Sequence, residues 1–529
     1  MDKNIDCLFI GHNDVTFEDY EMLVSMLGKD SGTYRDLNLN FIRCDKKPYS
    51  LPDIYNQLAQ PEKPLGISDI FSPAIAYLGT YIKRAGFTFD FVNSFQDEKD
   101  RLKELLTTRN ILSIAVITTL YVSPYPVSEI ISFIKKHNKT AKIIIGGPFI
   151  FNQSFIGLST GFFKSIGADY FITSTQGEST LTKVLTALKT NSSLGRIENL
   201  SFQKNGKWVA NPTISENNRL EDNIPHWDLF SNRIGKFASV RTVIACPFSC
   251  SFCGFHVRQG TYQAVDVTFV EEELNAIEAL GTVTSLSFID DTFNYPPERF
   301  KKILRMMIRN RYSFKWNCQF RCQFADKEMV ELMKESQCEG VFLGIESANP
   351  KVLSNMNKKA AAGDYKRGLA LLNEFAIPSH ANFIIGFPGE THETVRDNID
   401  FINDTCPTFF RAQVWYCDPA TPIYRDKQKY GISGTGFEWS HATMNAREAF
   451  DIVDEIFLEK MNALWMPQYN FEINGAYGMM HRGMSLEQVE KFLTAFNRGI
   501  LHKLRHPKNP DVSEDLLQEM KEQVRIDQR

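Results

Sequence analysis

The sequence lacks any long apolar run and carries little excess charge of either sign. No apolar stretch approaches the roughly 20 residues that a membrane-spanning helix needs, so we expect no membrane partner. The 59 basic and 63 acidic residues give a net charge of −4, which provides no electrostatic footprint for nucleic acid. The first residues show no basic segment leading into an apolar core, so we expect no signal peptide.

Cysteine is also scarce, with ten residues in a chain of 529. This number does not suggest a disulfide framework and suits a reducing, cytoplasmic compartment. The chain is too long for one hydrophobic core, because domains hold about 150 residues each. No internal repeat is visible, and no G-x-G-x-x-G sequence follows a predicted strand, which weakens the case for a dinucleotide site.

Three of the ten cysteines lie together with the spacing C-x3-C-x2-C. Cys246, Cys250 and Cys253 follow residues 238–245, which predict a strand. Cysteine thiolates hold iron–sulfur clusters, and three ligands on a four-iron cluster leave one iron open. A zinc site is the alternative, because His256 could complete a Cys3His set. Zinc sites usually pair two such knuckles, however, and no second knuckle follows, so we favour the cluster.

Residues 1–200 predict a Rossmann-like domain. A helix is expected from Ala74, and strands are expected at residues 88–92, 111–117, 141–145 and 168–173. Alternation of strands and helices predicts a doubly wound parallel sheet. Residues 14–70 look irregular and polar, and their role cannot be assigned from the sequence. Residues 201–236 predict a hairpin and then a Pro-containing connector.

Ligands of doubly wound sheets bind at the carboxyl ends of the strands. In this chain those ends carry glycines and small polar residues, which allow a large flat ligand to approach the backbone closely. Tight turns between strands and helices would use the same residues, and their spacing alone does not separate the two explanations. The residues concerned are Thr118, Thr119, Gly146, Gly147, Gln176 and Gly177.

Residues 237–425 predict a second α/β domain. Five strand–helix units carry polar residues or glycines after their strands, which indicates a partial or full TIM-like barrel with its active face at the carboxyl ends of the strands. The residues at those ends are Asp290, Asp291, Arg321, Glu346, Ser347, Gly386, Pro388 and Gly389. Residues 426–529 predict a mostly helical region, with helices at 447–464 and 486–504.

The motifs resemble those of cobalamin-dependent radical S-adenosylmethionine (SAM) enzymes. SPAIAYLGTYIKRAGFTFDFVN, IIIGGP and GADYFITSTQGESTL resemble the cobalamin-binding domain of that family. The C-x3-C-x-aromatic-C loop, DDTF, LGIES and IIGFPGET resemble, in this order, the radical SAM core. The stretches DCLFIGHNDVTFEDY and YRDLNLNFI resemble the phosphinate P-methyltransferase group within the family.

The resemblance implies a cobalamin-binding domain at 1–200, a connector at 201–236, a radical SAM core at 237–425 and a helical extension at 426–529. It implies that the three cysteines hold a [4Fe–4S] cluster and that the strand-end residues of the first domain contact cobalamin. The sequence D-x-H-x-x-G is absent, which implies a cobalt without a histidine ligand. The residues implied to contact SAM are Phe252, Asp290, Asp291, Arg321, Glu346, Ser347, Gly386, Pro388 and Gly389. For Arg321, a structural ion pair is an equal alternative.

The implied activity is methyl transfer from SAM, through methylcobalamin, to an unactivated carbon or a phosphinate phosphorus of a natural-product intermediate. An external one-electron donor, such as flavodoxin or ferredoxin, is expected. Two alternatives stay open: a cobalamin radical SAM enzyme that rearranges or cyclises its substrate, and a non-catalytic cobalamin or zinc sensor. Four aromatic side chains could contact the substrate or belong to the core, namely Trp415, Tyr416, Trp439 and His441. The sequence identifies neither the substrate nor the oligomeric state.

Overall fold

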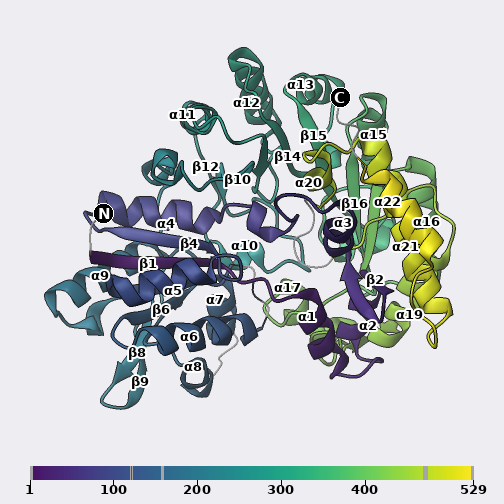
Figure 1. The fold of residues 1–529 in the computed structure, drawn as a ribbon. Helices are drawn as coiled ribbons and strands as arrows, with labels where there is room; N and C mark the ends of the chain where they lie inside the picture. The colour runs from purple at the N-terminus through teal and green to yellow at the C-terminus, as the bar shows by residue number, and fades with distance from the viewer. Residues whose placement is uncertain (1–3, 120, 122, 156–159, 469–474, 526–529) are drawn as a thin grey trace. The chain divides into compact units, whose positions relative to one another are not determined.

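The computed structural model describes residues 4–119, 121, 123–155, 160–468 and 475–525. It divides into two compact units. Figure 1 shows the chain coloured by residue number. The first unit comprises residues 1–15, 68–245 and 258–283, and the second comprises residues 16–67, 246–257 and 284–529. This division differs from the predicted boundaries, because residues 16–67 group with the C-terminal half of the chain.

The first unit contains a seven-stranded sheet with the order β4-β1-β5-β6-β7-β8-β9. The first five strands are parallel, as predicted, and β8 and β9 add an antiparallel hairpin. The hairpin turn has positive φ at Asn205 and Gly206. The strands are β1 (Asn4–His12), β4 (Phe89–Ser94), β5 (Asn110–Ile117), β6 (Lys142–Gly146), β7 (Tyr170–Ile172), β8 (Leu200–Lys204) and β9 (Lys207–Ala210).

Helices cover both faces of this sheet, which explains why β5 is apolar along almost its whole length. Apolar side chains of α5 to α8 pack in one core with those of β1 and β5, while α4 and α9 contact β1 and β5 respectively. The helices are α4 (Pro73–Arg84), α5 (Lys99–Thr108), α6 (Tyr125–His137), α7 (Pro148–Phe155), α8 (Thr160–Ile166), α9 (Glu178–Thr190) and α11 (Val267–Glu278). The strand predicted at 238–245 is divided into β10 (Phe237–Val240) and β11 (Val243–Ile244), and β11 pairs with β12 (Gln263–Ala264).

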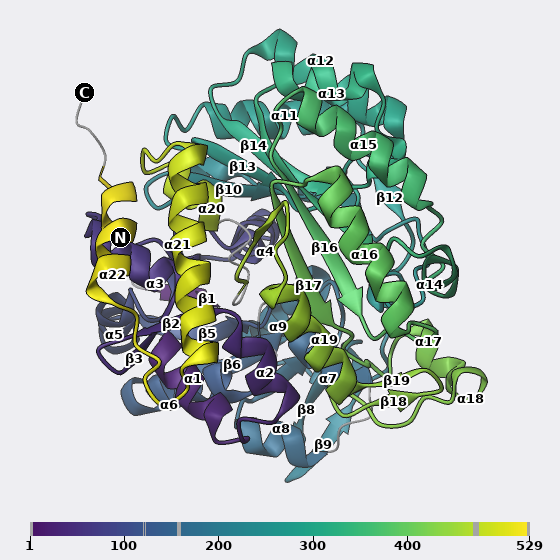
Figure 2. The same ribbon diagram turned by 90° about the vertical axis from the view of Figure 1, so that its right-hand side faces the viewer.

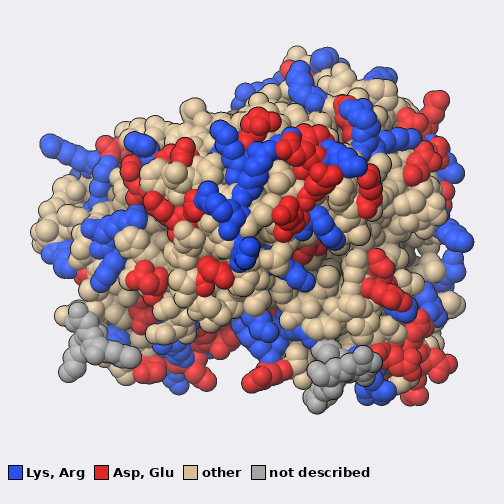
Figure 3. Space-filling model, turned by 90° about the horizontal axis from the view of Figure 1, so that it is seen from above, with Lys and Arg blue, Asp and Glu red and all other residues tan. Residues whose placement is uncertain are grey.

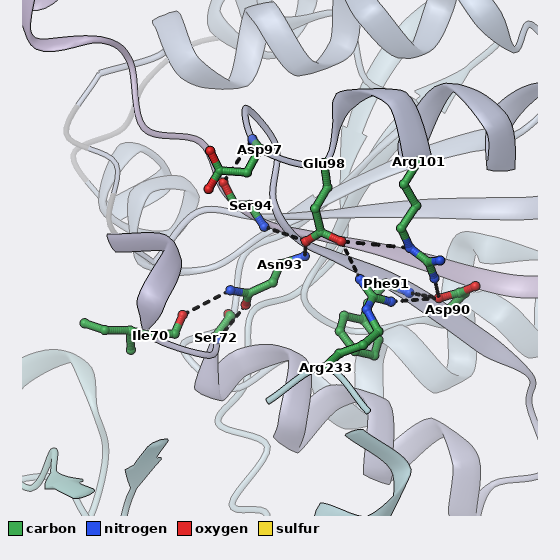
Figure 4. A network of polar contacts seen from close by, with 10 residues as sticks. All are labelled: Ile70, Ser72, Asp90, Phe91, Asn93, Ser94, Asp97, Glu98, Arg101 and Arg233. Carbon is green, nitrogen blue, oxygen red and sulfur yellow. Dashed lines mark hydrogen bonds and ion pairs between the residues drawn. The ribbon is translucent and has the colours of Figure 1, made fainter. Parts of the chain in front are cut away.

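Ion pairs tie the predicted connector to the sheet of the first unit (Figure 4). Arg233 donates to Glu98 Oε2 at 2.6 Å and to Asp90 Oδ1 at 3.2 Å, and its guanidinium lies 3.7 Å from the centroid of the Phe91 ring. Arg101 joins the same Asp90 oxygen at 2.7 Å. These contacts, together with the β8–β9 hairpin, make residues 201–236 an integral part of the first unit rather than a free linker.

The second unit contains six parallel strands in the order β13-β14-β15-β16-β17-β20. Helices that follow the strands lie along one face of them (Figures 1 and 2), which confirms the predicted partial barrel. The strands are β13 (Ser285–Phe288), β14 (Lys315–Phe320), β15 (Cys338–Glu346), β16 (Ser379–Ile385), β17 (Phe409–Val414) and β20 (Leu464–Trp465). The helices are α12 (Pro297–Asn310), α13 (Lys327–Glu335), α14 (Pro350–Asn355), α15 (Ala362–Glu374) and α16 (His392–Thr405).

Residues 16–67 are regular rather than irregular, which corrects the interpretation from sequence. They form three short helices and a hairpin, and the side chains of Thr16, Ser31 and Ser50 cap the helix N-termini. None of these elements exceeds nine residues, and the helical spacing of Leu51, Ile54, Tyr55 and Leu58 in α3 is confined to a short stretch. The elements are α1 (Phe17–Ser25), α2 (Gly32–Asn38), β2 (Phe41–Cys44), β3 (Lys47–Ser50) and α3 (Leu51–Ala59).

The N-terminal segment packs against C-terminal elements of the same unit. Lys503 donates to the carbonyl oxygens of Asn38 and Phe41, each at 2.7 Å, and satisfies carbonyls that follow α2. The fully buried Arg411 donates to the side chain of Asn40. These contacts link residues that are more than 370 positions apart in the sequence.

The C-terminal region is mostly helical, as predicted. The helix expected at 486–504 is α21 (Leu486–Arg505), and it begins with a capping box between Ser485 and Gln488. The helix expected at 447–464 is shorter, because α19 ends at Leu458. Helices α21 and α22 lie side by side and are drawn in yellow in Figures 1 and 2. The remaining elements are α17 (Pro422–Arg425), α18 (Lys427–Tyr430), β18 (Ser440–His441), β19 (Met444–Asn445), α19 (Ala446–Leu458), α20 (Gly475–Met480) and α22 (Glu514–Gln523).

Charged side chains of both signs are interspersed on the face drawn in Figure 3. This mixture agrees with the small net charge of −4. Within the described ranges, no helix has the length and apolar character needed to cross a bilayer.

Candidate active site

The three clustered cysteines form one turned loop in the second unit. Ala245, directly before the loop, has a φ of +60°, and the Cys253 amide donates to the Cys250 carbonyl at 3.1 Å. None of the three thiols is part of a disulfide. Burial, opposed by a hydrogen bond from the Phe255 amide and assisted by the nearby groups Asp291, Cys250 and Cys246, raises the pKa of Cys253 to about 11. The three sulfurs are therefore close enough to interact electrostatically.

The cysteine loop can be compared with the ligand geometries of a single metal ion and of an iron–sulfur cluster. No three His, Cys, Asp or Glu side chains among the described residues converge on a position for one ion. Zinc requires its ligands within about 2.0–2.3 Å of a common point, whereas each cysteine of a four-iron cluster binds a different iron. The zinc alternative, with His256 as fourth ligand, therefore has no geometric support in this part of the structure.

Two aspartates follow β13 beside the cysteine loop. Asp290 is buried, whereas the Asp291 side chain is exposed. Although Asp291 reaches the surface, the protein around its carboxyl limits the hydration of the charged form, and this effect together with the charge of Asp290 raises the pKa of Asp291 to about 7. The next residue, Thr292, places its hydroxyl oxygen 3.8 Å from Cys246 Sγ. The predicted SAM-binding carboxylates thus lie next to the predicted cluster ligands.

Glu346 ends β15 in a strained conformation, with a φ of +65°. Its Oε1 pairs with Lys358 Nζ at 2.9 Å, and both groups are buried. Gly344 leaves room for this pair, because a Cβ there would lie 3.1 Å from Lys358 Nζ. Lys358 also lies 5.5 Å from the centroid of the Phe252 ring, in the cysteine loop.

Arg321 and Ser347 make mainly structural contacts. The Arg321 guanidinium stacks 3.7 Å from the centroid of the Phe248 ring and donates to the Lys358 carbonyl. The Ser347 side chain is fully buried and is 3.3 Å from Asn398 Oδ1. Their contacts with SAM stay predictions.

Residues 386–389 form a turn after β16 that we call the glycine turn. Gly386 and Gly389 have φ values of +85° and +96°, which side chains other than glycine rarely adopt. A Cβ on Gly386 would lie 2.5 Å from the Trp439 ring. Inside the turn, the buried Glu390 accepts hydrogen bonds from the Gly386 amide and from Asn398. Burial raises the pKa of Glu390 to about 8.

The hairpin of β18 and β19, in the C-terminal region, is hydrogen-bonded to the glycine turn. This contact was not predicted from the sequence. The Thr443 amide donates to His441 Nδ1 at 3.3 Å, so the proton of the neutral ring lies on Nε2, which donates to the Gly386 carbonyl at 2.9 Å. Thr443 Oγ1 in turn accepts from the Gly389 amide at 3.2 Å. Trp439 stacks on His441 with ring centroids 5.0 Å apart. No local sequence signal reveals this contact, because its partners are 54 and 55 residues apart.

The four candidate aromatic residues therefore differ in their surroundings. Trp415 and Trp439 are each only 2% exposed and belong to the core beside Phe387. His441 holds the glycine turn, whereas Tyr416 is 59% exposed.

In the first unit, the predicted cobalamin-contacting residues lie at one edge of the sheet. Thr118 is buried and donates to the Gly146 carbonyl at 2.8 Å, while Thr119 is exposed. Gly147 has a φ of +114° and leaves no room for a Cβ beside Thr118. Gln176 is hydrogen-bonded to the main chain of Asn218.

Two further features of that edge bear on a ligand. The Gly177 amide donates to Glu178 Oε2 at 2.9 Å, so this amide is engaged by its own helix. His12, at the carboxyl end of β1, is buried, and its Nε2 has no hydrogen-bond partner among the residues that the structure describes. Burial lowers the pKa of His12 to about 4, so the ring is neutral at physiological pH.

Comparison with known proteins identifies the second α/β region. Residues 240–402 match the radical SAM superfamily model. An uncharacterized methyltransferase of Pyrococcus horikoshii is 28% identical over 300 residues, which are 55% of this chain and 63% of that protein. The chain thus spans less than two thirds of the length of this curated relative.

Solved structures match over nearly the whole chain. The radical SAM methyltransferase TsrM from Kitasatospora setae, with cobalamin and a [4Fe–4S] cluster bound, has a TM-score of 0.62 at 15% identity and covers 99% of both chains. The cobalamin-dependent radical SAM enzyme OxsB has a TM-score of 0.60 at 13% identity and covers 98% of this chain and 80% of its own. The chain therefore contains a radical SAM domain at residues 240–402 and has the fold of the cobalamin-dependent radical SAM enzymes.

Proposed function

We propose that the protein is a cobalamin-dependent radical SAM methyltransferase. The observation that carries this proposal is the loop of Cys246, Cys250 and Cys253, which lies beside Asp291 within the radical SAM domain. When bound, a [4Fe–4S] cluster supplies one electron to the sulfonium of SAM, which is chemistry that no side chain can supply. The substrate would be a small molecule, methylated at an unactivated carbon or at a phosphinate phosphorus. The electron would come from a flavodoxin or ferredoxin.

The residues of the second unit would bind and orient SAM. The three thiols would hold the cluster, and coordination would remove the protons that the raised pKa values of Cys246 and Cys253 favour. Asp291 offers a carboxylate for the amine of SAM, and Glu346 Oε2 offers an acceptor for its ribose hydroxyls, because Oε1 is paired with Lys358. The glycine turn would line the adenine, with the Pro388 carbonyl held by Asn355 and the Gly389 amide held by Thr443.

The first unit fits cobalamin less completely. Thr119, Gly147 and Gly177 leave the strand ends open to a flat ligand, but the side chains of Thr118 and Gln176 are engaged within the protein. The orphaned Nε2 of His12 adds an unexplained polar atom at this edge, and such atoms in native structures often mark a missing ligand or water. When bound, cobalamin would carry the methyl group from SAM to the substrate.

Anaerobic reconstitution tests the cluster. We expect about four irons and four sulfides per chain, lost when Cys246, Cys250 and Cys253 are together replaced by alanine. One zinc per chain, retained without iron, would favour the sensor alternative and overturn the proposal.

Methyl-labelled SAM tests the reaction. With cobalamin, a reductant and candidate substrates, we expect the label in the product by mass spectrometry. Formation of 5′-deoxyadenosine together with an altered but unlabelled product would instead indicate a rearrangement or cyclisation.

A further inference from the structure

The last residue of α14 and the two residues after it are hydrogen-bonded to the cysteine loop. Ser251 donates through its hydroxyl to the Asn355 carbonyl at 2.6 Å and through its amide to the Met356 carbonyl at 2.8 Å. Asn357 Nδ2 donates to the Ser249 carbonyl at 2.8 Å. Three consecutive residues therefore fix the main chain on both sides of Cys250, which is itself buried.

Asn355 also contacts the glycine turn. Its side-chain Nδ2 donates to the Pro388 carbonyl at 2.9 Å. Gly389 makes this approach possible, because a Cβ there would collide with Asn355 Nδ2. One residue thus contacts the cysteine loop with its main chain and the glycine turn with its side chain, whereas Asn357 contacts only the cysteine loop.

We propose that Asn355 is a positioning residue that sets the spacing between the cluster and the adenine end of SAM. This inference rests on the proposed function, in which the cysteine loop holds the cluster and the glycine turn lines the adenine. The sulfonium can accept an electron only if the amino-acid end of SAM reaches the open iron while the adenine stays in the turn. A displacement of about 1 Å in such a geometry can lower a rate by about 100-fold.

The contact is rigid for a physical reason. The carbonyl carbon and the amide group of Asn355 belong to the same residue, so few bonds can rotate between the two hydrogen bonds. Asn355 is also the last residue of α14, whose N-terminus is capped by the Asn349 side chain. Motion of the cysteine loop relative to the glycine turn would therefore have to break a hydrogen bond.

The test compares Asn355→Asp with the wild-type protein. The carboxylate keeps the size of the side chain but replaces the N–H donor that faces the Pro388 carbonyl with an acceptor. The matched control is Asn349→Asp, which keeps the N-cap of the same helix and likewise replaces an N–H donor with an acceptor, here the donor that faces Asp397 Oδ2 at 2.7 Å at an exposed position. Each reconstituted protein is measured for iron content, for SAM affinity, for 5′-deoxyadenosine formation and for the electron paramagnetic resonance (EPR) spectrum of the reduced cluster with and without SAM.

We expect Asn355→Asp to retain its iron but to form 5′-deoxyadenosine at least tenfold more slowly, with a smaller spectral change on SAM addition. Asn349→Asp should match the wild type in all four measurements. If Asn355→Asp does not fold, Ser251→Ala removes the same link from the side of the cysteine loop, and we expect a reduced spectral change there too.

Two outcomes separate the inference from the proposed function. A wild-type protein that binds no cluster or does not cleave SAM would overturn the proposed function. If the wild-type protein cleaves SAM, the role of Asn355 is judged from the variants. Unchanged cleavage and an unchanged spectral response in Asn355→Asp, or in Ser251→Ala if Asn355→Asp does not fold, would overturn only that role.

Discussion

The buried carboxyl group of Glu390 is hydrogen-bonded to the glycine turn. Its carboxyl is fully buried and accepts hydrogen bonds from the Gly386 amide and the Asn398 side chain. Asn398 is a residue of α16, so the carboxyl joins the turn to the helix that follows it. Its partners among the described residues are amide groups rather than a cation, so burial dominates and raises its pKa to about 8.

Glu390 is expected to make the second unit less stable as the pH rises. The folded pKa of about 8 exceeds the ordinary value of 4.5, so the folded state keeps a proton that the unfolded chain has released between these values. The stabilisation is complete below about pH 4.5 and is lost as the pH rises through 8. Thermal unfolding of Glu390→Gln and wild type should coincide near pH 5, and the wild type should melt at a lower temperature near pH 8. Parallel pH profiles would contradict this role of Glu390.

Gly389 is expected to tolerate no side chain. Alanine there would need a φ of +96° and would push its Cβ into Asn355 Nδ2. We expect Gly389→Ala to lower the free energy of unfolding by about 1–3 kcal/mol and to weaken SAM binding. Gly363→Ala in α15 is the control, because its Cβ would meet nothing within 4 Å. The two variants can be compared by urea denaturation and by SAM titration; equal effects would contradict the steric argument.

Sequence reasoning worked for residues whose chemistry is local. The spacing of Cys246, Cys250 and Cys253 predicts a cluster site. The position of Gly386 and Gly389 after a strand predicts a tight turn. Asn355 could not be predicted, because its importance comes from a hydrogen bond to Pro388, 33 residues away in the sequence. The cofactor contacts assigned to single residues remain predictions.

At the scale of elements, the hairpin of β18 and β19 secures the glycine turn through two hydrogen bonds, from His441 and to Thr443. We expect His441→Ala to raise the SAM concentration needed for half-maximal 5′-deoxyadenosine formation by about tenfold, because a hydrogen bond of about 1.5 kcal/mol corresponds to that factor. The maximal rate should change less, since the cysteine loop is untouched.

Two variants serve as controls for His441. His441→Gln keeps one donor and one acceptor and should restore most of the SAM affinity. His506→Ala removes an exposed histidine of the C-terminal region and should have no effect. A His441→Ala protein with wild-type SAM dependence would show that the hairpin only packs against the turn.

Elements with a local sequence signal were predictable, and elements without one were not. Helix α21 has 20 residues and a capping box, so its apolar period and its start are both visible in the sequence. The hairpin of β2 and β3 has only four residues in each strand and turns through Asp45 and Lys46, both at positive φ without a glycine. Such a turn gives none of the usual Asn-Gly or Asp-Gly signals.

At the scale of the whole molecule, residues 38–43 and the C-terminal part of the chain form one packed region of the second unit. Lys503 and Arg411 satisfy main-chain and side-chain oxygens of residues 38–41. The amide of Val512 donates to the Arg43 carbonyl at 2.9 Å, in front of α22. Sequence reasoning placed residues 16–67 with the nearest domain, because proximity along the chain was the only guide.

Removal of residues 506–529 is therefore expected to loosen residues 32–50. Hydrogen exchange followed by mass spectrometry should show faster exchange in β2 and β3, which lose the contact with Val512. Exchange in β5, which pairs with β1 and β6 in the first unit, should not change. Unaltered protection of β2 and β3 in the shortened chain would contradict this coupling.

The packing of Lys503 on residues 38–41 also sets an order of events during synthesis. The two segments are 465 positions apart, so at about 5–20 residues per second the ribosome needs roughly 25–90 s to supply the partner of the first segment. Until then Phe41 and Ile42, both fully buried in the finished protein, have no partner from α21 and are exposed to aggregation or to chaperones. The second unit can close only after α21 has been synthesised, so a cluster delivered to the cysteine loop before that point would meet an unfinished unit.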